Sequence, residues 1–166
     1  MISTALRALA DGQKAWRTLA AGPRPVADAR WLCWMVAWRV TLGAAKVAIS
    51  LPVLVRLVRV TAGGALEHQR SVLRCRLLRE WYTQQSPLLP GNCLERSLLV
   101  HATWARTSAS TQLVVGFRKT GHDTQGHTWV TSSGEVLLES PKDVAGFEPA
   151  CVFDASGTRI AASAAA

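Results

Sequence analysis

The chain has 166 residues, of which 49% are hydrophobic, so it is long enough and apolar enough to bury a core and is not a disordered chain. Its net charge of +8 is uneven: residues 1–90 carry 13 Lys and Arg against 4 Asp and Glu, a net of +9, whereas residues 91–166 carry 6 against 7, a net of −1. The basic half favours an acidic or anionic partner. No nucleic-acid-binding motif accompanies the charge, and we therefore expect no nucleic-acid partner.

The cysteines and the apolar segments bear on localisation. No two of the four cysteines form a Cys-x-x-Cys pair, and charged residues interrupt the first apolar run, so we expect no signal peptide and a cytoplasmic protein with reduced thiols. The most apolar stretch, residues 31–60, is broken by basic residues, and its longest uncharged piece is nine residues. A membrane span needs about 20, so we expect buried or interfacial helices instead.

The first half of the chain is predicted to be helical. Helical patterns cover residues 2–20, a segment starting at Asp28, and residues 65–82, with prolines and the Gly-Gly pair at 63–64 between them. In the segment after Asp28, four bulky residues are spaced for one face of a helix: Trp31, Trp34, Met35 and Trp38. We expect most of these tryptophans to lie in a core. Docking of this basic region to a partner or a membrane surface is the alternative.

The second half changes character at residue 92. A helix is predicted over residues 92–105, with Asn92 as its N-cap and Glu95 placed for a capping box. Residues 111–119 are predicted to form a strand, and "HTWVT" and "EVLLE" a hairpin around "SSG". The chain is therefore predicted to be an α+β protein, with a helical region over residues 1–90 and a core over residues 91–166 in which one helix packs on a small antiparallel sheet.

Cys93 is the candidate nucleophile. It falls in the first turn of a predicted helix, where unpaired amides and the helix dipole favour a thiolate. The alternative is that Cys93 is a small buried hydrophobe, as free cysteines often are. Cys33 and Cys75 lie inside helical patterns and Cys151 has no helix start nearby, so they are weaker candidates.

His127 is the candidate base, and its partner depends on one turn. A three-residue loop Ser132–Gly134 pairs Thr131 with Glu135, Trp129 with Leu137 and His127 with Glu139, which places a carboxylate beside the imidazole. A two-residue loop shifts this register by one and moves Glu139 to the other face. The position of Gly134 favours the three-residue loop.

The remaining histidines are weaker candidates. His122 lies in the polar stretch "KTGHDTQG", which is typical of a mobile surface loop, and His101 is in the middle of a helix. A zinc site built from Cys93, His122 and His127 lacks the paired spacing of zinc ligands, so we expect neither a metal nor another cofactor.

The segments "NCLERSLL", "LVVGFRK" and "GHTWVTSSGEVLLE" together resemble the transglutaminase-like cysteine peptidases of lasso peptide biosynthesis, in their stand-alone form. The resemblance covers about 50 residues. The matching positions are Cys93, Leu94, Arg96, Ser97 and Leu98; Val115, Gly116 and Phe117; and His127, Trp129, Val130, Gly134 and Glu139.

The resemblance implies a papain- or transglutaminase-like core with a Cys93–His127–Glu139 triad, and we assign Arg96 and Trp129 to substrate binding. The family usually has Asp as the third member, so Asp143 and Glu135 stay open as alternatives to Glu139. Thr128 replaces the usual Ala after the histidine.

The function implied by the resemblance is removal of the leader from a lasso precursor peptide. The expected partners are that precursor, a separate leader-recognition protein and a macrolactam-forming cyclase. Two alternatives remain: a non-catalytic docking protein, which would tolerate replacement of Cys93, and an acyl transferase that uses the same thioester.

Overall fold

The computed structural model describes residues 25–63, 68–83 and 92–161. The helix predicted over residues 2–20 lies outside these ranges. The described helices are α2 (Pro25–Ala48), α3 (Leu51–Thr61), α4 (His68–Thr83), α5 (Cys93–Trp104) and the short α6 (Pro141–Val144).

Two prolines begin helices. The helix predicted from Asp28 starts three residues earlier, at Pro25. Pro52 lies in the first turn of α3, with Ser50 as the N-cap. Proline is tolerated there because the first amides of a helix have no intrahelical acceptor.

The strands form one antiparallel sheet. They are β1 (Thr111–Thr120), β2 (Asp123–Ser132), β3 (Glu135–Val136), β4 (Glu148–Phe153) and β5 (Arg159–Ile160), in the order β3-β2-β1-β4-β5. β1 and β2 pair along their whole length, so the stretch around His122 is the tip of a hairpin and not a long loop. Helices and a separate antiparallel sheet confirm the α+β prediction.

The predicted register between β2 and β3 is wrong. The loop has two residues, Ser133 and Gly134, both with positive φ (53° and 81°), and it pairs Ser132 with Glu135. Two positive φ values are typical of the tight hairpin turn that matches strand twist. Because Ser133 adopts the left-handed conformation, the turn closes with two residues, and Ser132 belongs to the strand and not to the loop. The strand predicted over "EVLLE" is short and ends at Val136.

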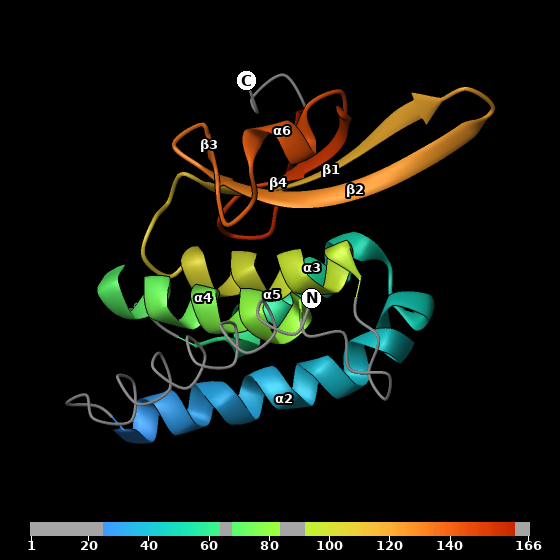
Figure 1. The fold of residues 1–166 in the computed structure, drawn as a ribbon. Helices are drawn as coiled ribbons and strands as arrows, with labels where there is room; N and C mark the ends of the chain where they lie inside the picture. The colour runs from blue at the N-terminus through green and yellow to red at the C-terminus, as the bar shows by residue number, and fades with distance from the viewer. Residues whose placement is uncertain (1–24, 64–67, 84–91, 162–166) are drawn as a thin grey trace, which may run out of the picture.

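The sheet separates two apolar layers. Helices α2 to α5 lie on one side of the sheet and α6 lies on the other, with α2 outermost (Figure 1). Leu113, Val130 and Phe153 join the helices in the larger core cluster, while Val114 and Trp129 belong to a smaller cluster. The alternation along each strand follows from the two-residue period of its side chains.

The larger core runs across residue 90, where composition predicts a division into two regions. The indole N–H of Trp31 donates to Thr103 Oγ1 (3.3 Å), which joins α2 to α5. In the same layer, Arg74 Nη2 lies 2.6 Å from Asp28 Oδ1, and both side chains are buried. The first helices therefore pack directly against the helix that begins at Cys93.

Candidate active site

Cys93 is the first residue of α5 and is half-buried. Asn92 caps the helix, since its side-chain oxygen accepts a hydrogen bond from the backbone N–H of Glu95 (3.0 Å). The remaining first-turn amides and the positive end of the helix dipole lie beside the thiol. This is the electrostatic setting expected for a nucleophilic cysteine.

The Glu95 side chain does not complete the predicted capping box. Its carboxylate is 2% exposed and binds two cations of α2, Lys46 Nζ at 2.6 Å and Arg39 Nη1 at 3.3 Å. Only its backbone N–H serves the cap. The first turn of α5 is therefore anchored to α2, two residues from Cys93.

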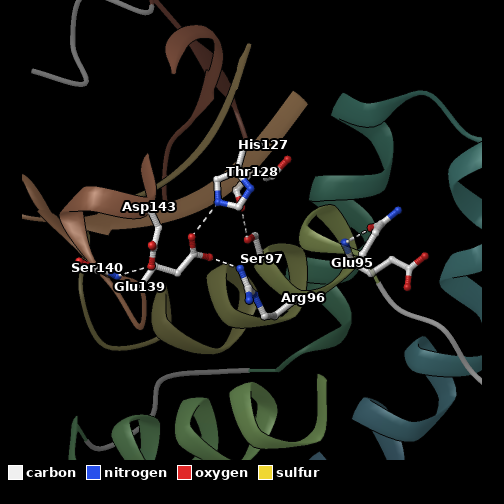
Figure 2. A network of polar contacts seen from close by, with 9 residues as sticks. Glu95, Arg96, Ser97, His127, Thr128, Glu139, Ser140 and Asp143 are labelled. Carbon is white, nitrogen blue, oxygen red and sulfur yellow. Dashed lines mark hydrogen bonds and ion pairs between the residues drawn. The ribbon is translucent and has the colours of Figure 1, made fainter. Parts of the chain in front are cut away.

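Glu139 is the carboxylate that contacts His127. Its Oε2 lies 2.7 Å from His127 Nε2, and its Oε1 is bound by Arg96 Nη2 (Figure 2). An ionised carboxylate can only accept, so Nε2 carries the proton and donates it to Glu139. In the neutral imidazole Nδ1 then holds the free lone pair.

Leu138 explains how Glu139 reaches His127 despite the shorter loop. Leu137 N–H still donates to Val130 O (2.8 Å), which continues the two-residue-loop register. Leu138 then takes a φ of 63°, an uncommon conformation for a residue other than glycine, and turns the chain out of the strand. Glu139 thus reaches the imidazole from a loop, and not from the opposite strand position that the sequence predicts.

Two side chains of α5 connect this helix to the surroundings of His127. Arg96 binds Glu139, and Ser97 Oγ donates to the carbonyl of Thr128 at 2.7 Å, directly after His127 (Figure 2). Cys93 lies one helical turn before Ser97 and so faces the same side of α5. The structure records no hydrogen bond between the Cys93 thiol and His127, both of which it describes.

Aromatic side chains support the imidazole. The ring of His127 is stacked with that of Trp129 (centroids 6.1 Å apart) and lies 5.2 Å from that of Phe147. The Arg118 guanidinium covers Phe147 at 4.4 Å. These contacts restrict the orientation of the imidazole ring.

Gly116, which pairs with His127 across the hairpin, makes room for Trp129. A Cβ at this position would lie 2.7 Å from Trp129 Cη2 and 2.8 Å from the carbonyl oxygen of Glu148. Neither the Glu148 backbone carbonyl nor the packed indole of Trp129 can move easily to make room for a methyl group. The glycine of the second motif is therefore explained by a close approach and not by a turn.

The two residues assigned to substrate binding lie beside His127 and its carboxylate partner. Trp129 is 6% exposed and packs in the smaller cluster beside His127, so it has little surface to offer a substrate. Arg96 is bound to Glu139. Both residues contact the imidazole or its carboxylate partner, which is a positioning role.

The structure separates the other candidates from His127. Asp143 caps α6 through the backbone N–H of Ser140, and Glu135 is exposed at the start of β3. His122 is exposed at the tip of the β1–β2 hairpin. His101 is buried, and its Nε2–H donates to the carbonyl of Asp154 (2.9 Å); burial lowers the pKa of His101 to about 4.

No group of three or more His, Cys, Asp or Glu side chains suited to a metal occurs among the residues that the structure describes. Within the same ranges, no helix is long and apolar enough to cross a membrane.

The profile of the transglutaminase-like superfamily matches residues 32–152. The chain belongs to this superfamily. The match begins within α2 and ends in β4, so the family unit includes helices of the basic half as well as the strand that carries His127. No curated protein and no solved structure matches the chain significantly. Members of the superfamily are typically cysteine-dependent enzymes and include peptidases and acyltransferases.

Four residues to which the sequence analysis assigns no role complete the site. Ser97 and Phe147 contact the histidine strand, and Arg39 and Lys46 neutralise Glu95. Ser97 follows Cys93 at the spacing of one helical turn, a signal available in the sequence. Nothing local indicates the pairing of Glu95 with Arg39, which lies 56 residues away.

Proposed function

We propose that the protein is a cysteine peptidase that removes the leader from a lasso precursor peptide. The observation that carries the proposal is the placement of Glu139 between His127 and Arg96, next to the helix that begins at Cys93. A nucleophile at a helix start, an imidazole and an orienting carboxylate are the parts that acyl-transfer chemistry requires. The motifs that the chain shares with lasso leader peptidases favour a lasso precursor peptide as the substrate.

In the proposed mechanism the Cys93 sulfur attacks the carbonyl carbon of the last leader residue, and His127 takes the thiol proton on Nδ1. The C–S bond forms as the carbonyl π electrons move to oxygen, and the backbone amide of Cys93 donates to that oxyanion. The C–N bond then breaks, and His127 gives the proton to the leaving amine. Water, deprotonated by His127, hydrolyses the thioester and releases the leader carboxylate and the free thiol. Glu139 orients the imidazole throughout.

Partners follow from the same resemblance. We propose that a separate leader-recognition protein delivers the precursor and that a macrolactam-forming cyclase consumes the freed core peptide. We assign no leader-recognition module to the helices and the five-stranded sheet that the described residues form. We therefore expect weak cleavage by the chain alone and faster cleavage with the partner.

The test is a mass-spectrometric cleavage assay on a lasso precursor, with and without the leader-recognition protein. Wild type should cut once, Cys93→Ala should not cut, and Cys33→Ala, which removes an exposed thiol of α2, should cut like wild type. Equal cleavage by wild type and Cys93→Ala, or none by wild type with the partner present, contradicts the proposal. The product separates the alternatives: a leader that ends in the free carboxylic acid indicates a peptidase, whereas a leader joined by a new amide bond to an added primary amine, in preference to the acid, indicates an acyl transferase.

A further inference from the structure

Phe117 is an exposed aromatic side chain close to the candidate active site. It lies on β1, and 47% of its surface is open. Across the hairpin it pairs with Gly126, the residue directly before His127. The Phe117 ring lies over this glycine, since a Cβ there would be 3.3 Å from Phe117 Cε1 and 3.5 Å from Cδ1. The ring is therefore held beside the strand position that precedes the candidate base.

The Phe117 ring lies on the face of the sheet that the helices cover. Side chains alternate along a strand, so Phe117 shares its face of β1 with Leu113, which packs against the helices in the larger core. The β1–β2 hairpin extends beyond the end of α5 (Figure 1), and this explains why Phe117 stays open while Leu113 is buried. Phe117 thus continues the apolar side of β1 past the helix layer.

Two hydrogen bonds fix how α5 runs along β2. Ser97 Oγ of α5 donates to the carbonyl of Thr128 (2.7 Å). Further along the chain, Ser108 Oγ, just after the helix, accepts from Ser132 Oγ at the end of β2 (3.2 Å). The helix and the strand therefore lie side by side and run in the same direction.

This arrangement places the start of α5 level with Gly126. Cys93 precedes Ser97 by one helical turn, a rise of about 6 Å along the helix axis. Moving back along β2 by about the same distance leads from Thr128 to Gly126, because a strand advances about 3.3 Å per residue. The candidate nucleophile and the Phe117 ring are thus both next to Gly126, which has no side chain to separate them.

The strand surface around Phe117 carries little charge. Of the residues that β1 places on this face, Lys119 is the charged one, two positions closer to the tip of the hairpin. On the same face of β2 lie Thr124, Gly126 and Thr128, which are uncharged. An aromatic ring in such surroundings favours an apolar side chain, because a charged one would lose water without gaining a partner.

We propose that Phe117, held over Gly126, forms the wall of a subsite that receives an apolar side chain of the peptide substrate, next to the bond that is cut. The occupant follows from the position of the ring. A peptide whose carbonyl carbon meets the Cys93 sulfur places a flanking residue beside Phe117, since an extended chain advances about 3.3 Å per residue. The inference rests on the proposed function for the peptide nature of the substrate. The subsite itself requires only that Cys93 is the reactive thiol.

The test measures how fast Cys93 of the full chain is alkylated by iodoacetamide and by N-benzyliodoacetamide, with the modified residue identified by mass spectrometry. Each rate is divided by the rate of the same reagent with free cysteine, which removes the intrinsic difference between the two reagents. Wild type should prefer the benzyl reagent by about tenfold, the order of discrimination that one apolar contact provides. In Phe117→Ala the ratio should fall to about one.

Lys119→Ala is the matched control for Phe117→Ala. Lys119 is exposed on the same face of β1, two residues further toward the tip, and its removal should keep the benzyl preference. Because Phe117 is about half open, Phe117→Ala should melt at the wild-type temperature, which would establish that the variant is folded.

Three results would overturn the proposal. A wild-type Cys93 that reacts with neither reagent is one, and a wild type without a benzyl preference is another. The third is an equal preference in wild type and Phe117→Ala, because the ring would then not line the space beside the thiol.

The leader-cleavage assay on the same proteins separates this inference from the peptidase activity. Cleavage by wild type without a benzyl preference at Cys93 would keep the peptidase and remove the subsite. A benzyl preference that depends on Phe117, without cleavage of the precursor, would keep the subsite and contradict the peptidase.

Discussion

The Glu139 carboxylate lies 2.7 Å from Nε2 of His127 although the strand that leads toward it ends at Val136. The chain turns at Leu138, whose φ of 63° is compensated by the charge-assisted contacts of Glu139, to the imidazole on one oxygen and to Arg96 on the other. A strained residue of this kind persists only where its surroundings determine its conformation. Arg96 and His127 hold the Glu139 carboxylate in place and so fix the conformation of Leu138.

Replacing Glu139 tests its role directly. In Glu139→Gln the side-chain shape is kept but the negative charge is lost, so the imidazole loses both its orienting acceptor and the charge that stabilises its protonated form. We expect the cleavage rate to fall by about 10²–10⁴-fold with little change in KM.

The matched control for Glu139→Gln is Asp143→Asn. Asp143 is an acidic residue four positions further on, exposed, and engaged with the backbone of Ser140. It should cleave at the wild-type rate. A larger loss in Asp143→Asn than in Glu139→Gln would instead make Asp143 the third member of the triad.

Arg96 is expected to act through Glu139 and not through the substrate. Arg96→Met leaves the carboxylate free to turn away from His127, so kcat should fall by about a hundredfold, the order of loss that a misplacement of about 1 Å causes. Arg96→Lys restores a positive charge and should recover part of the rate. If KM rises while kcat is unchanged, the original assignment of Arg96 to substrate binding would be correct.

Gly116 should tolerate no side chain. Gly116→Ala places a methyl against Trp129 and the Glu148 carbonyl, so the free energy of unfolding should fall by about 1–3 kcal/mol, as in overpacked cores. Chemical denaturation measures this loss, and the cleavage assay should show a reduced rate because Trp129 stacks with His127. Lys119→Ala, at an exposed position of the same strand, should match wild type in both measurements.

Glu95 links the basic helices to the first turn of α5. Glu95→Gln removes the carboxylate that binds the buried Arg39, and breaking a buried ion pair in this way costs about 3–5 kcal/mol. In Arg39→Met/Glu95→Gln the loss should be smaller than the sum of the two single losses, which a double-mutant cycle measures. Additive losses would mean that the two residues do not interact and would weaken the connection between the two halves.

His101 should make the protein less stable in mild acid. Burial lowers its pKa to about 4, whereas an unfolded histidine titrates near 6.5, so between these values the unfolded chain binds a proton that the native chain does not. The free energy of unfolding should therefore fall as the pH is lowered from 6.5 to 4, by roughly 3 kcal/mol. His101→Gln should remove this part of the pH dependence, and His122→Gln, an exposed histidine, should keep it. Equal slopes in wild type and His101→Gln would show that other groups cause it.

Local signals account for what the sequence predicts correctly. The β-branched run of β1 and the cap at Asn92 act within a few residues, and both are found where expected. The β2–β3 register does not follow from local signals in the same way. Gly134 is compatible with a two-residue or a three-residue loop, and the choice depends on whether Ser133 adopts a positive φ.

The approach of Glu139 to His127 is a tertiary effect. No period in "EVLLES" indicates that Leu138 turns the chain back, since the reason lies in Arg96, 43 residues earlier. The sequence therefore predicts the pairing of the two residues through a register that the structure does not have.

The core that spans Trp31 to Phe153 has a consequence for biosynthesis. Helices α2 to α4 leave the ribosome well before β1 and β4, which cover the same apolar layer. At about 5–20 residues per second, synthesis from Trp31 of α2 to Phe153 of β4 takes roughly 6–25 s, and the inner face of α2 stays incompletely covered for that time. Contacts of such long sequence separation also slow folding. The core therefore closes only after β4 has left the ribosome, and until then the inner faces of the helices are open to other apolar surfaces.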